Sequence, residues 1–299
     1  MQTEEIKKYL IKLGLPGRDN YGLPTSRKTF PDGAHFRTEE LLTTVEEYEE
    51  AFSLYDKGGF VVNRITDVRG TMFDRDEEIL RKLELARGHG CEVIMGPGSC
   101  GNPFDISQQA EEGAIVEGKI RGMDQMADMI RDMLRVVELG CRGFLLFDEG
   151  LLDIALKMRK EGKLPPETKF KISANISVAN AAAINFWFSL LGEQDEINPI
   201  RDLTLPMISA MREVTDHALD IHVYWRLKIA RTMEAPEIVR VGSPVYLKNS
   251  SSGVGVTVED RCSKSFRVVE MIRKYYPDAI QSEPYAKSLN IPAKPGAKW

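Results

Sequence analysis

The chain has 299 residues, long for one ordinary domain but normal for a single α/β barrel. Its formal net charge of −5 argues against a nucleic-acid-binding protein, and no stretch approaches the roughly 20 apolar residues of a membrane-spanning helix. A composition of 42% hydrophobic and 28% charged residues is typical of a soluble protein with a large core. The charged, amphipathic first residues lack the apolar centre of a signal peptide, so we expect a cytoplasmic protein.

A short β-type run, a loop and an amphipathic helix recur eight times along the chain. The predicted strands cover residues 34–41, 60–66, 91–97, 141–149, 169–175, 196–200, 219–225 and 244–250. Alternating strands and helices are typical of a parallel sheet, and eight such units predict a (β/α)8 TIM barrel. A doubly wound open sheet is the alternative. It needs fewer units and usually carries an early GxGxxG fingerprint, which this sequence lacks.

Two segments flank the predicted barrel of residues 34–282. Residues 1–33 contain a first helix followed by a stretch rich in Pro and Gly, which predicts an N-terminal extension. Residues 283–299 form a short C-terminal tail that we expect to be peripheral, either packed on a neighbouring subunit or mobile. We expect a homo-oligomer.

The four cysteines include no CxxC pair, so neither a zinc site nor an iron–sulfur cluster is expected. Cys91 and Cys141 each open an apolar run, which predicts buried, free thiols in a reducing compartment. Cys100 lies in the glycine-rich stretch GPGSCGNP, where it could be reactive, and its role stays open.

The alternation along each strand predicts which side chains enter the barrel, because the surrounding helices need apolar partners. In LDIHVYW (219–225), the apolar residues at 221, 223 and 225 face the helices. The lumen then receives Asp220, His222 and Tyr224. The same reasoning predicts that several other polar side chains point into the barrel or share one face of their strand: Arg37, Glu39, Ser173, Asn175, Glu196, Asn198, Tyr246 and Lys248.

The carboxyl ends of the strands hold the chemistry of barrel enzymes, so the polar residues expected there form the candidate site. The candidates for acid/base catalysis are His222, Glu149, Asp148, Lys248 and Glu39. Glu149 and His222 are also the predicted ligands of a divalent metal ion, because a hard cation suits carboxylate oxygens and an imidazole.

A second group of side chains is predicted to bind the substrate. Arg37 and Arg64 would hold an anionic group or stabilise developing negative charge. Asn249 and Ser250 open the small-residue loop NSSSGVGVTVED, whose backbone N–H groups suit phosphate or carboxylate. The remaining candidates are Asn175, Asn198 and Tyr224.

Several of these residues also have a purely structural alternative. His222 could be a satisfied structural histidine, and Lys248 could pair with a carboxylate. Asp148 could cap the helix that follows it, and Arg201–Asp202 could form a local ion pair and cap. If Lys248 is functional, it could anchor an anion or form a Schiff base.

Three segments resemble the barrel domain of the collagenase-like peptidases, family U-32: KISANISVANAAAINFWFSLLG, NPIRDLTLPMI and LDIHVYW. The family pattern has a strand ending in Asn, a helix ending in Leu-Gly, an RELSL-like step and a strand with a late histidine. The matching residues here are Asn175, Leu191–Gly192, Arg201–Leu205 and His222. The cysteine signature that binds an iron–sulfur cluster in many members is absent, and Asp202 stands where Glu is usual.

The resemblance implies the barrel fold and a peptidase-like hydrolase. Together with the residues, it predicts a cytoplasmic TIM-barrel enzyme that acts on a small anionic metabolite by acid/base or metal-assisted hydrolysis. A lyase or aldolase-type enzyme using Lys248 is one alternative, and a non-catalytic binding protein or complex subunit is another. In each case we expect a small-molecule ligand and neither a nucleic-acid nor a membrane partner.

Overall fold

The computed structural model describes residues 2–98, 119–226, 229–252 and 255–296. In these residues eight parallel strands form a closed ring, in the order β6-β5-β4-β3-β2-β1-β9-β7, with β7 paired back to β6. The strands are β1 (Phe36–Leu41), β2 (Arg64–Asp67), β3 (Glu92–Met95), β4 (Gly143–Leu146), β5 (Lys169–Ile172), β6 (Glu196–Ile197), β7 (Leu219–Trp225) and β9 (Val245–Ser250). The short β8 (Ile229–Ala230) only extends β7 antiparallel. The predicted TIM barrel is confirmed.

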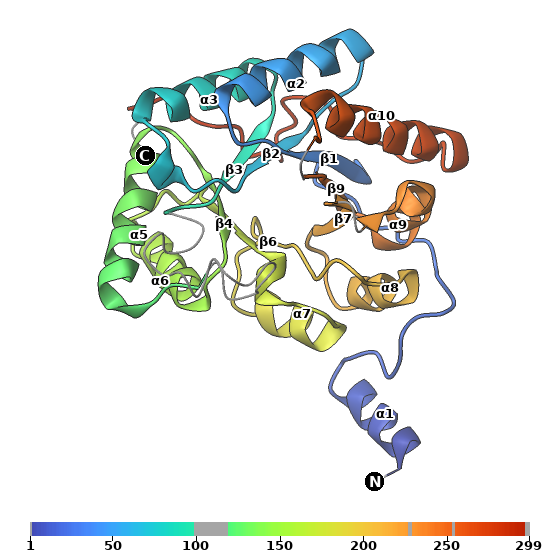
Figure 1. Ribbon diagram of the computed structural model, residues 1–299. Helices are drawn as coiled ribbons and strands as arrows, with labels where there is room; N and C mark the ends of the chain where they lie inside the picture. Colours follow the sequence, from blue (N-terminus) through green and yellow to red (C-terminus); the bar gives the residue numbers. More distant parts are fainter. Residues whose placement is uncertain (1, 99–118, 227–228, 253–254, 297–299) are drawn as a thin grey trace.

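Each barrel strand is followed by a helix on the outside of the ring (Figure 1). These helices are α2 (Val45–Gly58), α3 (Asp76–Gly88), α5 (Gly122–Glu138), α6 (Glu149–Lys160), α7 (Ala181–Phe188), α8 (Leu205–Glu213), α9 (Ala235–Gly242) and α10 (Val258–Tyr275). Local sequence sets their ends. The Thr44 side chain accepts from Glu47 N at the start of α2, and Gly59, at φ +65°, ends that helix in the left-handed conformation that glycine tolerates best.

The core lies between the strands and these helices. Ile65, Val93, Phe144 and Ile172 point outward from four strands and are fully buried against the helix layer. Cys91 and Cys141 lie in the same core as free thiols, as expected, whereas Cys100 lies outside the described residues. No helix in the described parts of the chain is long and apolar enough to cross a membrane.

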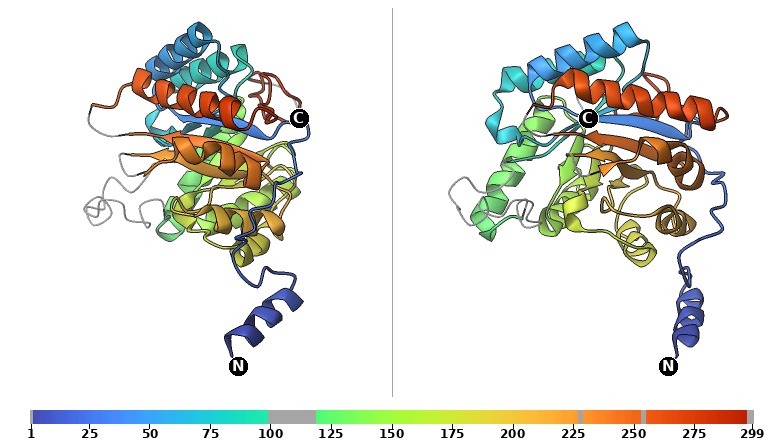
Figure 2. Two further views of the ribbon diagram at one scale, coloured as in Figure 1. Left: turned by 90° about the vertical axis from the view of Figure 1, so that its right-hand side faces the viewer. Right: turned by 45° about the vertical axis from the view of Figure 1, so that its right-hand side comes forward.

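The two flanking segments behave differently. Helix α1 (Thr3–Lys12) has no buried residue and stands away from the barrel (Figures 1 and 2). The C-terminal tail, by contrast, lies against the amino-terminal end of the barrel: Tyr285 N donates to Gly90 O at 3.1 Å, and Asn290 Nδ2 donates to Arg142 O at 2.6 Å. Hydrogen bonds hold the tail on the surface of this chain's own barrel as far as Ala293, whose carbonyl accepts from Arg87.

Charged side chains fill the lumen, where branched apolar residues are usual in this fold. Arg64 lies at its centre and contacts three carboxylates: Glu92 at 2.6 Å, Glu39 at 3.1 Å and Glu196 at 2.5 Å. Its guanidinium carbon also lies 3.3 Å from the ring centroid of Tyr246. All five side chains are almost completely buried.

Three lysines complete this network. Lys169 pairs with Glu92 and Glu196, whereas Lys171 pairs with Glu39 and Asp220. Lys248 Nζ lies 2.9 Å from Glu39 Oε1 and 4.0 Å from Asp220 Oδ2. An isolated buried charge costs several kcal/mol. The network (Arg64 and the three lysines against Glu39, Glu92, Glu196 and Asp220) therefore holds its charges by mutual pairing.

Candidate active site

A cavity of about 320 Å³ opens at the carboxyl ends of the strands. We call it the mouth cavity. Part of its wall is apolar: Leu41, Val68, Leu145, Phe147 and Trp225. The uncharged polar part consists of Ser173, Asn175, Asn198, His222, Ser250 and Ser252. The charged side chains are Arg201, Arg226 and Lys248, and no Asp or Glu is among the described residues that line the cavity. The mouth cavity therefore suits an anion.

His222 and Lys248 are direct neighbours across the β7–β9 ladder. Both side chains line the mouth cavity, and they are only 4% and 3% exposed. In parallel strands, paired residues on one face lie about 5 Å apart. The barrel thus places an imidazole beside a primary amine at the floor of the cavity.

Asn198, the residue directly after β6, orients the imidazole. Its Nδ2 lies 3.1 Å from His222 Nδ1 and donates to Asp220 O at 2.7 Å. When the amide donates to Nδ1, a neutral imidazole carries its proton on Nε2. Burial, and then the nearby charge of Lys248 and Arg201, hold the pKa of His222 well below its usual range. His222 is therefore a neutral group that can donate from Nε2.

Lys248 connects the cavity to the charged network below it. Burial, reinforced by the positive charge of Lys171, lowers the pKa of Lys248 to about 8, although Glu39 opposes the shift. Burial alone would raise the pKa of Glu39, but Lys171, Lys248 and Arg64 hold it well below its usual range. A fraction of Lys248 is therefore an uncharged amine near neutral pH, while Glu39 stays ionised.

Two arginines flank the indole of Trp225 at the rim. The guanidinium carbon of Arg201 lies 4.5 Å from the ring centroid, and that of Arg226 lies 5.2 Å from it. Arg201 Nη2 also donates to Asn175 Oδ1 at 3.0 Å. In the described parts of the chain, no carboxylate lies within 4.0 Å of either guanidinium. Burial, and then the charge of Arg226, lower the pKa of Arg201, as expected for cations without a counter-ion.

A β-bulge in β7 decides which aromatic residue enters the site. His222 pairs with Lys248, but Tyr224 pairs with Asn249 and Trp225 with Ser250. The extra residue reverses the alternation, so Trp225 lines the cavity and Tyr224 turns outward, where its hydroxyl bonds Thr232. The predicted facing of both residues was wrong.

Asn249 and Ser250 lie on opposite faces of β9. Asn249 Nδ2 donates to Arg261 O at 2.8 Å and to Ser265 Oγ at 2.9 Å, both on α10. Its predicted contact with a substrate is therefore wrong, because the residue after Lys248 must face the helices. Ser250 does line the cavity, and its buried Oγ has no hydrogen-bond partner among the described residues.

The acidic pair after β4 does not reach the mouth cavity. Asp148 caps α6 by accepting from Leu151 N at 2.9 Å, and also accepts from Ile120 N at 3.2 Å. Glu149 pairs with Lys119 and lines a separate cavity beside α6 and α7. The structural alternative for Asp148 holds, because the first turn of a helix needs such an acceptor.

The predicted metal ligands are not brought together. His222 lines the mouth cavity and Glu149 the cavity beside α6 and α7. No group of three or more His, Cys, Asp or Glu side chains that could hold a metal ion occurs in the residues that the structure describes. These residues do not fit the divalent ion expected from the sequence.

Three other predicted site residues lie too deep in the barrel to line the mouth cavity. Leu41, the last residue of β1, lines the mouth cavity, and side chains on one face of a strand recur about every 7 Å. Glu39 lies one such step below, and Arg64 pairs with it. Arg37 lies two steps below, at the amino-terminal end, where it donates to Tyr246 Oη and Ser282 Oγ, both at 2.8 Å.

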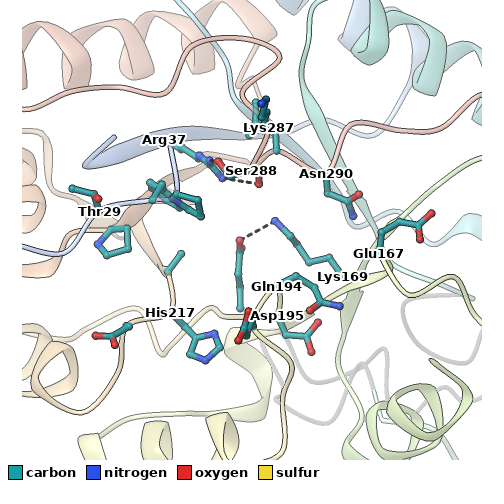
Figure 3. Close-up of a pocket in the computed structure, with 18 of the residues that line it drawn as sticks. Thr29, Arg37, Glu167, Lys169, Gln194, Asp195, His217, Lys287, Ser288 and Asn290 are labelled. Carbon is teal, nitrogen blue, oxygen red and sulfur yellow. Dashed lines mark hydrogen bonds and ion pairs between the residues drawn. The ribbon is translucent and has the colours of Figure 1, made fainter. Parts of the chain in front are cut away.

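A larger cavity, of about 820 Å³, lies at that amino-terminal end (Figure 3). Figure 3 shows Arg37, Lys169, Asp195 and His217 around it. Its buried charges have partners: Lys169 pairs with Glu196 at 3.1 Å, and Asp195 pairs with Arg159 at 2.6 Å. We place the candidate site at the mouth cavity, where barrel enzymes keep their chemistry and where Arg201 and Arg226 have no ion-pair partner among the described residues.

Trp225 and the two rim arginines line the mouth cavity, and the sequence did not predict them as site residues. Trp225 and Arg226 follow the bulge, which no local pattern marked. A local ion pair with Asp202 is one structural alternative for Arg201, but Asp202 is exposed and Arg201 contacts Asn175. The charges spaced two apart in KFKI (169–172) could have indicated a charged lumen.

The chain matches no protein-family model and no curated protein. Among solved structures, metallated homocysteine methyltransferase MmuM from Escherichia coli aligns with a TM-score of 0.51 at 11% identity, over 79% of this chain and 97% of its own. The U32 peptidase Mk0906 aligns with a TM-score of 0.41 at 13% identity, over 69% of this chain and 74% of its own. Thiamine phosphate pyrophosphorylase from Pyrococcus furiosus aligns with a TM-score of 0.47 at 11% identity, over 81% of this chain and 97% of its own. The MmuM similarity shows the barrel fold alone, and no activity follows from these matches.

Proposed function

We propose that this protein is an enzyme that binds a small anionic substrate in the mouth cavity and transforms it by acid/base chemistry at His222 and Lys248. One observation carries the proposal: the described lining has three cations and no carboxylate. Lys248 is paired with Glu39 below the cavity, whereas the two rim arginines have no carboxylate partner among the described residues. Keeping the two guanidinium groups unpaired at a partly buried site is costly, and a bound anion would offset that cost.

The side chains divide into two roles. Arg201 and Arg226 lie at the rim and would hold the anionic group, since guanidinium groups suit carboxylate and phosphate oxygens. His222 and Lys248 lie at the floor and would act on the reacting atoms. A neutral imidazole that donates from Nε2 can stabilise developing negative charge on oxygen.

Metal-assisted hydrolysis is the less favoured form of this proposal. The metallated state of MmuM is a property of that protein. In this chain the imidazole of His222 and the carboxylate of Glu149 line different cavities. We therefore keep acid/base chemistry and give the metal ion no role in it.

Titration calorimetry with inorganic phosphate and with succinate tests anion binding. We expect Arg201→Gln and Arg226→Gln each to weaken binding of the better ligand at least tenfold, which corresponds to about 1.4 kcal/mol. Arg131→Gln is the matched control, because Arg131 is 79% exposed on α5 and pairs only locally with Asp128. Equal affinity in wild type and both rim variants would contradict the proposal.

Turnover separates an enzyme from a binding protein. Mass spectrometry can follow a panel of small carboxylates and phosphate esters incubated with wild type or His222→Gln. We expect at least one panel member to be consumed by wild type, and the variant to bind it with similar affinity but convert it at least a hundredfold more slowly. Binding without turnover of any anion that binds would favour the non-catalytic alternative.

A further inference from the structure

We propose that Lys248 is a nucleophile that forms a Schiff base, and that the substrate is an anion carrying a ketone or aldehyde carbonyl. The inference rests on the proposed function and deepens it. The Lys248 side chain supplies the one primary amine among the described residues lining the mouth cavity. Imine formation is a chemistry that a buried amine can perform without any cofactor.

The depth of the cavity orients such a substrate. Arg201 and Arg226 come after the last residues of β6 and β7, whereas Lys248 lies two residues before the end of β9. Two residues of a strand span about 7 Å. An anionic group held by the rim arginines would therefore leave a carbonyl a few bonds away at the level of Lys248 Nζ.

The size and lining of the cavity limit the substrate further. A volume of about 320 Å³ corresponds to roughly ten water molecules, so a small oxo acid or sugar phosphate fits. Leu145 and Phe147 form an apolar part of the wall. Apolar walls exclude water, and loss of water drives an imine equilibrium forward.

Two neighbouring side chains, Glu39 and His222, support the reaction of the Lys248 amine. Glu39 Oε1 lies 2.9 Å from Nζ and positions the side chain from below. The lowered pKa of Lys248, about 8, supports the availability of a free amine. His222 is its neighbour across the ladder, and Asn198 holds the imidazole in the tautomer that donates from Nε2.

The reaction balances without a further reactant. The Lys248 ammonium first releases one proton to solvent. The lone pair of uncharged Nζ attacks the carbonyl carbon, a C–N bond forms, and the carbonyl electron pair moves to oxygen, which receives the Nε2 proton of His222 while Nζ returns one of its protons to Nε2. The hydroxyl of the resulting carbinolamine takes up a proton from solvent, the C–O bond breaks, water leaves, and the nitrogen lone pair forms the C=N bond of the iminium. Overall, an ammonium and a carbonyl give an iminium and one water. The single positive charge opposite Glu39 is kept, so the buried network remains neutralised.

Reductive trapping tests the assignment. Full-length protein is incubated with sodium cyanoborohydride and one of three ketone probes: pyruvate, dihydroxyacetone phosphate or acetone. We expect one reduced adduct per chain with an anionic probe, mapped to Lys248 by peptide mass spectrometry. The uncharged acetone should react at least tenfold more slowly. The faster of the two anionic probes identifies whether the rim prefers carboxylate or phosphate.

Matched variants keep the test specific. Lys248→Arg retains a cation opposite Glu39 but cannot form the imine, so its adduct should be lost while thermal stability stays close to wild type. Lys264→Arg removes a neighbouring lysine whose Nζ lies 3.3 Å from Ser251 Oγ, and its adduct should be unchanged. His222→Gln should bind the same anions and be trapped at least tenfold more slowly.

The outcomes separate this inference from the function on which it rests. Anion binding in calorimetry with no adduct from any probe would overturn the role of Lys248 and leave the anion site standing. Adducts spread over surface lysines, or retained in Lys248→Arg, would also overturn it. Absence of both anion binding and adduct would overturn the two proposals together.

Discussion

The cavities at the two ends of this barrel differ in how their charged side chains are paired, and this difference does not follow their volumes. The cavity at the amino-terminal end is larger, at about 820 Å³, yet Lys169 and Asp195 in its wall both have ion-pair partners. The mouth cavity is smaller, at about 320 Å³, yet its rim arginines have no carboxylate within pairing distance in the described chain. Unpaired charge, more than volume, is therefore the reason for placing the proposed anion site at the mouth cavity.

The strand β1 shows the same contrast over six residues. Arg37 holds the amino-terminal end together by bonding Tyr246 and Ser282. Glu39 anchors the central network, and Leu41 lines the mouth cavity. If this division is right, substitutions low in the barrel reduce stability, whereas substitutions at the mouth reduce binding and leave stability nearly unchanged.

The largest effect is expected at the centre. Glu39→Gln removes the carboxylate that Arg64, Lys171 and Lys248 share and leaves the buried network with one positive charge in excess. The free energy of unfolding should fall by about 3–5 kcal/mol in urea titrations. Asp153→Asn, which breaks an exposed pair with Lys157, is the control and should cost less than about 1 kcal/mol. A similar small loss for both would mean that the network does little for stability.

At the amino-terminal end, Arg37→Ala removes the bonds to Tyr246 and Ser282. Hydrogen bonds from a buried charged group contribute about 1.5–3 kcal/mol each. We expect a loss of about 2–4 kcal/mol in the free energy of unfolding, with phosphate or succinate affinity in calorimetry unchanged. A loss of anion affinity in a folded variant would move the ligand site to this end of the barrel.

Glu40, beside Glu39 but on the outer face of β1, should make stability depend on pH. Burial raises its pKa to about 7 in the folded protein, although Ser265 and Tyr55 oppose the shift. The unfolded chain releases this proton near pH 4.5, so the contribution is fully present below that pH and is lost as pH rises through 7. The loss amounts to about 3 kcal/mol.

Glu40→Gln isolates this effect, because the amide can still accept from Tyr55 Oη. Urea titrations from pH 4.5 to 8 should show a stability advantage of the variant that grows with pH. A constant difference between the two proteins across this range would show that Glu40 is ionised in the folded state as well.

The smallest effect is expected at the mouth. Ser250→Ala removes a buried hydroxyl that has no partner in the described residues, so the free energy of unfolding should change by less than about 0.5 kcal/mol. If the hydroxyl meets the bound anion, calorimetry should show a three- to tenfold loss of affinity, about 0.6–1.4 kcal/mol. Unchanged affinity would remove Ser250 from the site.

Local sequence was sufficient for the architecture. Eight β-type runs with amphipathic helices between them predicted the barrel, because strand and helix periods are properties of neighbouring residues. The same alternation predicted that His222, Asn198 and Lys248 face the lumen, and the structure places all three on the wall of the mouth cavity. It also predicted an inward Asp220, which lies in the charged network.

Only the tertiary structure decided three things: how deep each side chain lies in the barrel, which charged groups pair, and where the alternation along β7 is interrupted. Alternation predicts the face of a strand on which a side chain lies, but not its position along the barrel axis. For this reason Arg37 and Glu39 were expected at the mouth, although they lie below it. Pairing depends on partners far apart in the chain: Glu39 and Lys171 are 132 residues apart. The bulge in β7 places Trp225 in the cavity in place of Tyr224, and it arises from the register of β7 against its neighbour β9, which lies later in the chain. Strand register is set by the closure of the whole barrel, and for that reason no local pattern contained it.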